Sequence, residues 1–153
     1  MRPCLGKNPR TGAVEVDPDR TSTAANIPRS EVPTIVAKLA ALARCDVRQL
    51  ETFQVLRYTR GQFFKAHTDG FSGPASASGF ADSGRLVTLF VYLNEVQSGG
   101  ETVFPQLGPL SVRPEKGAAV VHFPETLGFE QDTRTEHEGA AAVDDKWLLA
   151  TWV

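Results

Sequence analysis

Apolar residues in the second half of the chain recur in short runs, and this pattern predicts a mainly β protein. Strands are expected over 53–58, 63–68, 86–93, 101–104, 110–112, 118–123, 133–137 and 147–153. Glycine, proline, asparagine and aspartate punctuate these runs, as they do the turns between antiparallel strands. Because no helical pattern alternates with the strands, the sequence favours a two-sheet jelly roll over a parallel α/β sheet.

One helical period precedes the strands. From Val32 to Ala43 the apolar residues follow a spacing of three and four, which predicts a helix from about Ser30 to Arg44. Ser30 is the expected N-cap, and Pro33 is tolerated in the first turn. We expect this helix to pack on the outside of a sheet as a structural support.

The first 27 residues are rich in Pro, Gly, Asp, Arg and Thr and show no sustained period. A short strand over 14–16 is compatible with them. The chain is therefore divided into an extended N-terminal segment over 1–27 and one domain over 28–153. A total of 153 residues is enough to bury a core without disulfide bridges.

Charge and composition exclude several partners. A net charge of −2 leaves no basic footprint for nucleic acid. No run of about 18 apolar residues is present, so no membrane span is expected. Cys4 and Cys45 show neither a disulfide framework nor metal-ligand spacing, so both are interpreted as ordinary thiols. The N-terminus lacks the apolar core of a signal peptide, which predicts a cytoplasmic protein. A secretory protein whose leader had been removed would look the same. Composition predicts no oligomeric state.

The sequence His67-Thr68-Asp69 carries the first sign of chemistry. Residues i and i+2 of a strand project to the same face, so the imidazole of His67 and the carboxylate of Asp69 can converge on one ion. Two histidines and one carboxylate on one face of an octahedral ion form the facial triad of non-haem Fe(II) oxygenases. The missing histidine must come from a distant strand.

Two histidines remain for that position. His122 lies in an apolar run and is interpreted as a core or edge histidine with one hydrogen-bond partner. His137 lies in the polar stretch Arg134–Gly139 near a strand end, where a ligand is easier to build; without His67 and Asp69 it would be taken for a plain surface histidine.

Lys146 opens the last apolar strand, which would place an ammonium inside the mouth of a barrel. Such a charge is costly unless an anion neutralises it. The distal carboxylate of a metal-bound dicarboxylate would do so; a lysine that snorkels from a strand end is the alternative. The Gly-, Ser- and Ala-rich segment 70–84 lies beside the expected metal and is a candidate lid.

Several motifs, in order, resemble the catalytic domain of prolyl 4-hydroxylases, which are 2-oxoglutarate (2OG)- and Fe(II)-dependent dioxygenases. They are Tyr58, His67-Thr68-Asp69, the run Arg85–Asn94, Gly99-Gly100-Glu101-Thr102-Val103-Phe104-Pro105, the run Leu110–Pro114, His137 and Lys146-Trp147. The resemblance extends from about Arg20 to Val153. It implies a double-stranded β-helix, the jelly-roll topology of that family.

The resemblance also implies roles for individual residues. His67, Asp69 and His137 would bind Fe(II), and Lys146 would pair with the C5 carboxylate of 2OG. Two further residues would belong to the cosubstrate site, Tyr58 through its hydroxyl and Thr88 by lining the pocket. Substrate contacts would come from Arg20 and Trp147.

The implied activity is hydroxylation of an unactivated C–H bond, most simply the 4-hydroxylation of a prolyl residue in a peptide or protein. It would use O2, convert 2OG to succinate and CO2, and depend on L-ascorbate. Two alternatives stay open. One is a related dioxygenase that acts on a free amino acid or small metabolite. The other is a catalytically silent jelly roll that binds a peptide or a divalent metal.

Overall fold

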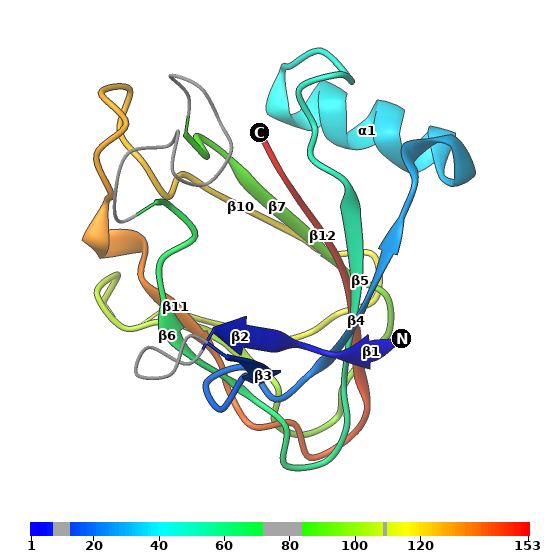
Figure 1. The fold of residues 1–153 in the computed structure, drawn as a ribbon, viewed down its shortest axis with the longest axis vertical. Helices are drawn as coiled ribbons and strands as arrows, with labels where there is room; N and C mark the ends of the chain where they lie inside the picture. Colours follow the sequence, from blue (N-terminus) through cyan, green and yellow to red (C-terminus); the bar gives the residue numbers. More distant parts are fainter. Residues whose placement is uncertain (8–12, 72–83, 109) are drawn as a thin grey trace.

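The protein is described here by a computed structural model, which describes residues 1–7, 13–71, 84–108 and 110–153. Two antiparallel sheets dominate the fold (Figure 1). The larger sheet contains, in spatial order, β1 (Arg2–Pro3), β4 (Thr23–Ile27), β5 (Phe53–Tyr58), β12 (Lys146–Trp152), β7 (Thr88–Tyr92) and β10 (Ala119–His122). The smaller sheet contains β6 (Phe64–His67), β11 (His137–Gly139), β8 (Thr102–Phe104) and β9 (Leu110–Val112). A separate hairpin pairs β2 (Leu5–Lys7) with β3 (Val14–Val16). The predicted mainly β jelly roll is confirmed.

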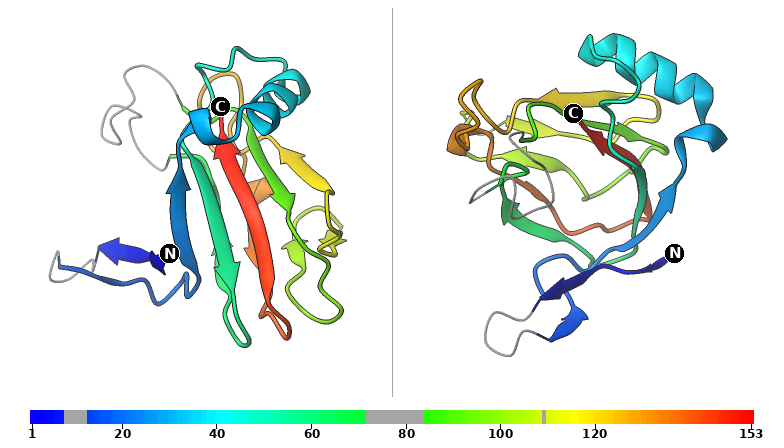
Figure 2. Two further views of the ribbon diagram at one scale, coloured as in Figure 1. Left: turned by 90° about the vertical axis from the view of Figure 1, so that its right-hand side faces the viewer. Right: turned by 45° about the horizontal axis from the view of Figure 1, so that its top comes forward.

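Sequence-distant strands become neighbours in this fold. β12, the last strand, lies between β5 and β7, and the views in Figure 2 show these strands side by side. β11 lies between β6 and β8 in the other sheet. Since side chains alternate across a strand, each sheet presents one face to the space between the sheets. Residues from the two ends of the chain can therefore meet inside the roll.

The larger sheet carries an apolar cluster on each of its faces. Its outer face packs against α1 (Pro33–Ala43) in a cluster that includes Leu39, Phe53, Leu89 and Leu149. Its inner face carries a second apolar cluster: Cys4, Leu56, Tyr58, Phe90, Tyr92, Ala142, Leu148, Ala150 and Trp152. The predicted outer position of the helix is confirmed.

Two predicted element boundaries are wrong. Ser30 does not cap the helix: it lies in a 3-10 turn over Arg29–Glu31, and α1 begins at Pro33. Proline disfavours helical backbone in the residue before it, so the helix begins at the proline itself. The strand expected over 133–137 is instead a 3-10 turn over Thr133–Thr135, followed by β11. The Asp132 carboxylate accepts the Arg134 backbone N–H at 3.1 Å and stabilises that turn.

The N-terminal residues take part in the larger sheet. β4 pairs with β5 along its whole length, and β1 pairs with β4. The proposed division of the chain at residue 28 stays a prediction. Cys4 and Cys45 are both free thiols, as expected. Among the described residues, no helix has the length and apolar character to cross a lipid bilayer. The candidate lid over 70–84 falls mostly on residues 72–83, which lie outside the described residues.

Two leucines of α1 provide a matched test of the outer core. Leu39 is 4 % exposed in the helix–sheet cluster, whereas Leu42 is 53 % exposed. Leu39→Ala is expected to lower the free energy of unfolding by about 2–5 kcal/mol, because it removes buried methyl groups and leaves a cavity. Leu42→Ala makes the same change in helix propensity but should lower the free energy of unfolding by less than about 1 kcal/mol. Urea denaturation followed by circular dichroism measures both, and equal losses would contradict the packing of α1 on the sheet.

Candidate active site

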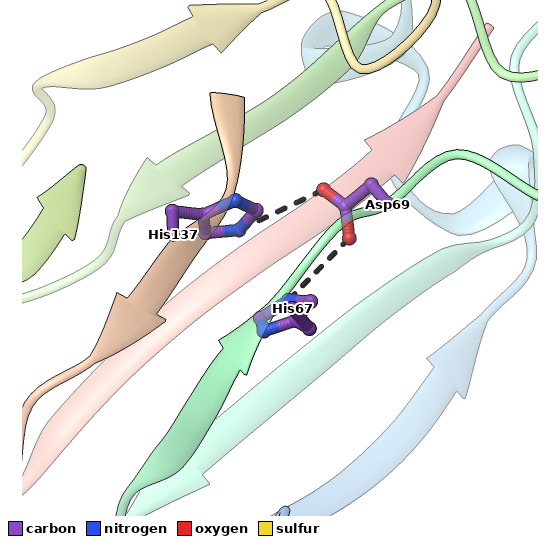
Figure 3. A group of neighbouring side chains, drawn as sticks. All are labelled: His67, Asp69 and His137. Carbon is purple, nitrogen blue, oxygen red and sulfur yellow. Dashed lines mark ion pairs between the residues drawn. The ribbon is translucent and has the colours of Figure 1, made fainter. Parts of the chain in front are cut away.

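His67, Asp69 and His137 converge in space although 70 residues separate the first from the last. His67 ends β6, Asp69 follows two residues later, and His137 opens β11 directly opposite His67 in the ladder (Figure 3). One nitrogen of each ring and one carboxylate oxygen all lie within 4.8 Å of one another. The individual contacts are 3.6 Å from His67 Nε2 to Asp69 Oδ1 and 3.8 Å from His137 Nε2 to Asp69 Oδ2.

Backbone carbonyls orient both imidazole rings. His67 Nδ1 lies 2.7 Å from the Lys65 carbonyl oxygen, and His137 Nδ1 lies 3.1 Å from the Thr135 carbonyl oxygen. Each Nδ1 therefore carries the proton that it donates, and each Nε2 keeps a lone pair. Rings held through the second nitrogen by a hydrogen bond are the usual arrangement for metal-binding histidines.

The charges of this cluster fit a divalent cation. Burial alone raises the pKa of Asp69, but the contacts with His122 and His67, together with the charge of His137, hold that pKa well below its usual range. Burial lowers the pKa of His137 to about 4, so its imidazole is neutral near pH 7. The Nε2 atoms of His67 and His137 both face the ionised carboxylate of Asp69. A bound Fe(II) would neutralise this carboxylate, and two imidazoles with one carboxylate are the donor set of the facial triad.

Lys146 places a second charge inside the roll. Its side chain is only 2 % exposed, and Nζ donates a hydrogen bond to the Gly100 carbonyl oxygen at 2.6 Å. The rings of Tyr58 and Tyr92 lie 5.2 and 5.6 Å from Nζ. Burial lowers the pKa of Lys146 to about 8, against an opposing effect of Glu101. A buried ammonium of this kind is a site for an anionic ligand.

A cavity of about 340 Å³ connects these groups. Its lining includes the residues expected to bind metal and cosubstrate, which are Tyr58, His67, Asp69, Thr88, His137 and Lys146. Arg20 also lines it, and its guanidinium lies 4.8 Å from the centre of the Phe64 ring. Trp147 is not among the described lining residues. It follows Lys146 in β12, so it projects from the other face, where Arg57 lies 5.2 Å from its ring.

Two lining or adjacent residues had no role in the sequence analysis. Arg85 forms a two-point ion pair with Glu51, at 2.6 and 2.9 Å, and stacks on Trp152 at the cavity wall. His122 was interpreted as a core or edge histidine with one hydrogen-bond partner. It is buried, but its Nε2 lies 3.3 Å from Asp69 Oδ2, and neither ring nitrogen has a hydrogen-bond partner among the described residues. Its apolar neighbours in the sequence concealed this position.

A family model for the 2OG-Fe(II) oxygenase superfamily matches residues 53–153, about two thirds of the chain. The chain belongs to this superfamily. Among curated relatives, prolyl 4-hydroxylase subunit alpha-1 of Mus musculus is 33 % identical over 160 aligned residues, which cover all of this chain and 30 % of the relative. Prolyl 4-hydroxylase 1 of Arabidopsis thaliana is 30 % identical, over 80 % of this chain and 47 % of the relative.

Solved structures agree with this assignment. A viral collagen prolyl hydroxylase from Paramecium bursaria Chlorella virus 1, crystallised with 2OG, superimposes with a TM-score of 0.74 and 25 % identity. The match covers 88 % of this chain and 78 % of that one. A Trichoplax adhaerens prolyl hydroxylase in complex with a peptide fragment shares the fold, with a TM-score of 0.69. The resemblance to prolyl 4-hydroxylases is confirmed. This superfamily member spans less than a third of the length of the alpha-subunit relatives.

Proposed function

We propose that this superfamily member is an Fe(II)- and 2OG-dependent dioxygenase that hydroxylates a prolyl residue of a peptide or protein. In the overall reaction one oxygen atom of O2 enters the C–H bond of the substrate, and the other enters succinate as 2OG loses CO2. His67, Asp69 and His137 would hold the iron, and Lys146 would hold the distal carboxylate of 2OG. When bound, the iron supplies the activation of O2.

The observation that carries this proposal is that one cavity contains both charged sites. The triad supplies two imidazoles and one carboxylate, and Lys146 supplies an ammonium with no carboxylate hydrogen-bonded to it among the described residues. A dicarboxylate satisfies both at once, because one end binds the metal and the other neutralises the ammonium. A site for a metal ion alone would not need the buried lysine.

The side chains around these groups orient the cosubstrate and limit its access to water. Tyr58 lies opposite Lys146 in the β5–β12 ladder, so both side chains point to the cavity and its hydroxyl can reach the same carboxylate. Leu56, Phe90 and Leu148 add apolar walls. A low-dielectric surrounding strengthens the pairing between Lys146 and an anion.

A proline-rich peptide is the proposed substrate. An extended polyproline II segment loses little conformational entropy on binding and presents its rings outward. Arg20 lines the cavity and would lie close to such a segment. The predicted contact of Trp147 with the substrate has no support from the position of this residue, because Trp147 projects from the opposite face of β12. Ascorbate would keep the iron reduced, and nucleic acid remains an unexpected partner.

The proposal predicts peptide-stimulated decarboxylation. Purified protein with Fe(II), 2OG, O2 and ascorbate should form succinate faster when a proline-rich peptide is present, and the peptide should gain the mass of one oxygen atom on a proline. Chromatography of succinate and fragment mass spectrometry of the peptide measure the two products. Equal amounts of succinate and hydroxylated peptide would show coupled turnover, and His67→Ala is the inactive control.

Other outcomes separate the alternatives. If no peptide stimulates succinate formation, the protein would still be an oxygenase but would act on another substrate. A panel of free amino acids would then be tested. Folded protein that neither binds Fe(II) nor forms succinate would overturn the enzymatic proposal and favour a silent jelly roll.

A further inference from the structure

His122 and Thr88 are cross-strand partners that both face Asp69. They are directly opposite in the β7–β10 ladder, so their side chains project from the same face of the larger sheet. The Thr88 hydroxyl donates a hydrogen bond to Asp69 Oδ2 at 2.9 Å, and His122 Nε2 lies 3.3 Å from the same oxygen. Two residues that are 34 positions apart in the chain therefore contact one oxygen of the candidate metal ligand.

The surroundings of His122 leave its ring few other partners. The side chain is 6 % exposed, its ring contacts those of Phe104 and His137, and neither nitrogen has a hydrogen-bond partner among the described residues. An N–H buried without an acceptor costs about 1–3 kcal/mol. Asp69 Oδ2, at 3.3 Å from Nε2, is the acceptor that lies within reach of this ring.

The two carboxylate oxygens of Asp69 are thus in different surroundings. An ionised carboxylate offers about two lone pairs on each oxygen. The Thr88 hydroxyl and the His122 N–H would together use both lone pairs of Oδ2. Each oxygen faces one histidine of the triad, Oδ1 at 3.6 Å from His67 Nε2 and Oδ2 at 3.8 Å from His137 Nε2. Among the described residues, however, no hydroxyl or second ring approaches Oδ1 as Thr88 and His122 approach Oδ2. Oδ1 is therefore the oxygen that is free to bind an ion.

We propose that His122 is a positioning residue for the metal centre: together with Thr88 it holds Oδ2 of Asp69, so that the carboxylate binds the ion through Oδ1 alone. This inference rests on the proposed metal site. The consequence concerns the number of open coordination positions. Three protein donor atoms leave three positions open on an octahedral ion, two for 2OG and one for O2. A carboxylate that bound through both oxygens would occupy one of these positions.

A direct role of His122 as a fourth metal ligand fits the structure less well. The group of donor atoms that lie within 4.8 Å of one another contains His67, Asp69 and His137 but does not include His122. His122 instead approaches Oδ2, the oxygen that Thr88 already holds. Its position therefore suits a contact with the carboxylate more than a contact with the ion.

The test uses Mn(II), a paramagnetic substitute for Fe(II), bound to the full chain without 2OG. His122→Leu, which removes the N–H, should lower Mn(II) affinity by about 10–100-fold, the usual cost of losing a partner of a metal ligand. At saturating Mn(II), water proton relaxation should fall by about one third, because a carboxylate that rotates onto the ion displaces one of three bound waters. His122→Gln places an amide N–H near the position of Nε2 and should restore most of both values.

If His122 had only a structural role, the His122→Gln and His122→Leu variants should differ little in the number of water molecules bound to Mn(II). Melting of the metal-free variants checks that they fold, and His122→Phe, which keeps a ring against Phe104, replaces the leucine variant if needed. Wild-type affinity and relaxation in the leucine or phenylalanine variant would overturn the proposal. So would pulsed electron paramagnetic resonance that finds three histidine nitrogens on the ion. Wild-type protein that binds no Mn(II) or Fe(II) would instead overturn the proposed metal site itself.

Discussion

Asp69→Asn is expected to lower Fe(II) affinity by at least about a hundredfold and to abolish succinate formation. Partners of metal ligands already contribute up to about a hundredfold in affinity, and a ligand should contribute no less. Asparagine keeps the shape of the side chain but removes the negative charge that faces the Nε2 atoms of His67 and His137. Anaerobic titration with Fe(II), followed by calorimetry, measures the affinity.

The matched control is Asp46→Asn. Asp46 is a half-exposed aspartate paired with Arg48 at 2.9 Å, outside the cavity. The Asp46→Asn substitution should leave Fe(II) affinity and succinate formation unchanged. Removal of metal by a chelator should abolish succinate formation by the wild-type protein. Added Fe(II) should restore this activity in the wild type but not in Asp69→Asn. Folded Asp69→Asn protein with unchanged Fe(II) affinity would rule out the proposed triad.

Lys146→Met is expected to act in opposite directions on binding and on stability. In the complex with 2OG it leaves the distal carboxylate buried without a counter-ion, which costs about 3–5 kcal/mol and corresponds to a loss of roughly 10²–10⁴-fold in affinity. In the free protein it removes an ammonium that is 2 % exposed, and the free energy of unfolding should rise. The lowering of the Lys146 pKa from 10.5 to about 8 corresponds to roughly 3 kcal/mol against the charged form.

The stability difference should depend on pH in a defined window. Below pH 8, Lys146 is protonated in both the folded and the unfolded protein, so the folded state bears the full cost of the buried charge. Between pH 8 and 10.5 the folded protein loses this proton while the unfolded chain keeps it, and the cost disappears. The advantage of Lys146→Met over wild type should therefore be largest below pH 8 and shrink as pH rises. Urea denaturation across this range measures it.

Lys38→Met controls for the change of residue type. Lys38 is an exposed position of α1, and methionine and lysine have similar helix propensities. This variant should keep 2OG affinity and show no pH-dependent gain. If Lys146→Met bound 2OG as well as the wild type does, the proposed role of the lysine would be wrong even though the metal site could stand.

Periodicity and turn residues were sufficient to predict most of the strands. β5, β7 and β12 coincide with apolar runs, because strands packed on both faces have few polar residues. β10 also coincides with an apolar run, although it is an edge strand with two exposed residues. The two wrong boundaries arose where a local interaction overrides the pattern of apolar residues. Pro33 moved the helix start, and the Asp132 side chain stabilised a turn within the predicted strand over 133–137.

Sequence alone determined the order of the strands, the spacing of His67 and Asp69, and the family to which these motifs belong. Spacing along a strand decides which side chains share a face, so the His67–Asp69 pairing could be predicted from the chain. Tertiary structure alone decided which strands lie side by side, because hydrogen bonding between distant strands leaves no local mark. It brought His137 opposite His67 and Lys146 opposite Tyr58, turned Trp147 away from the cavity, and placed His122 beside Thr88 against Asp69.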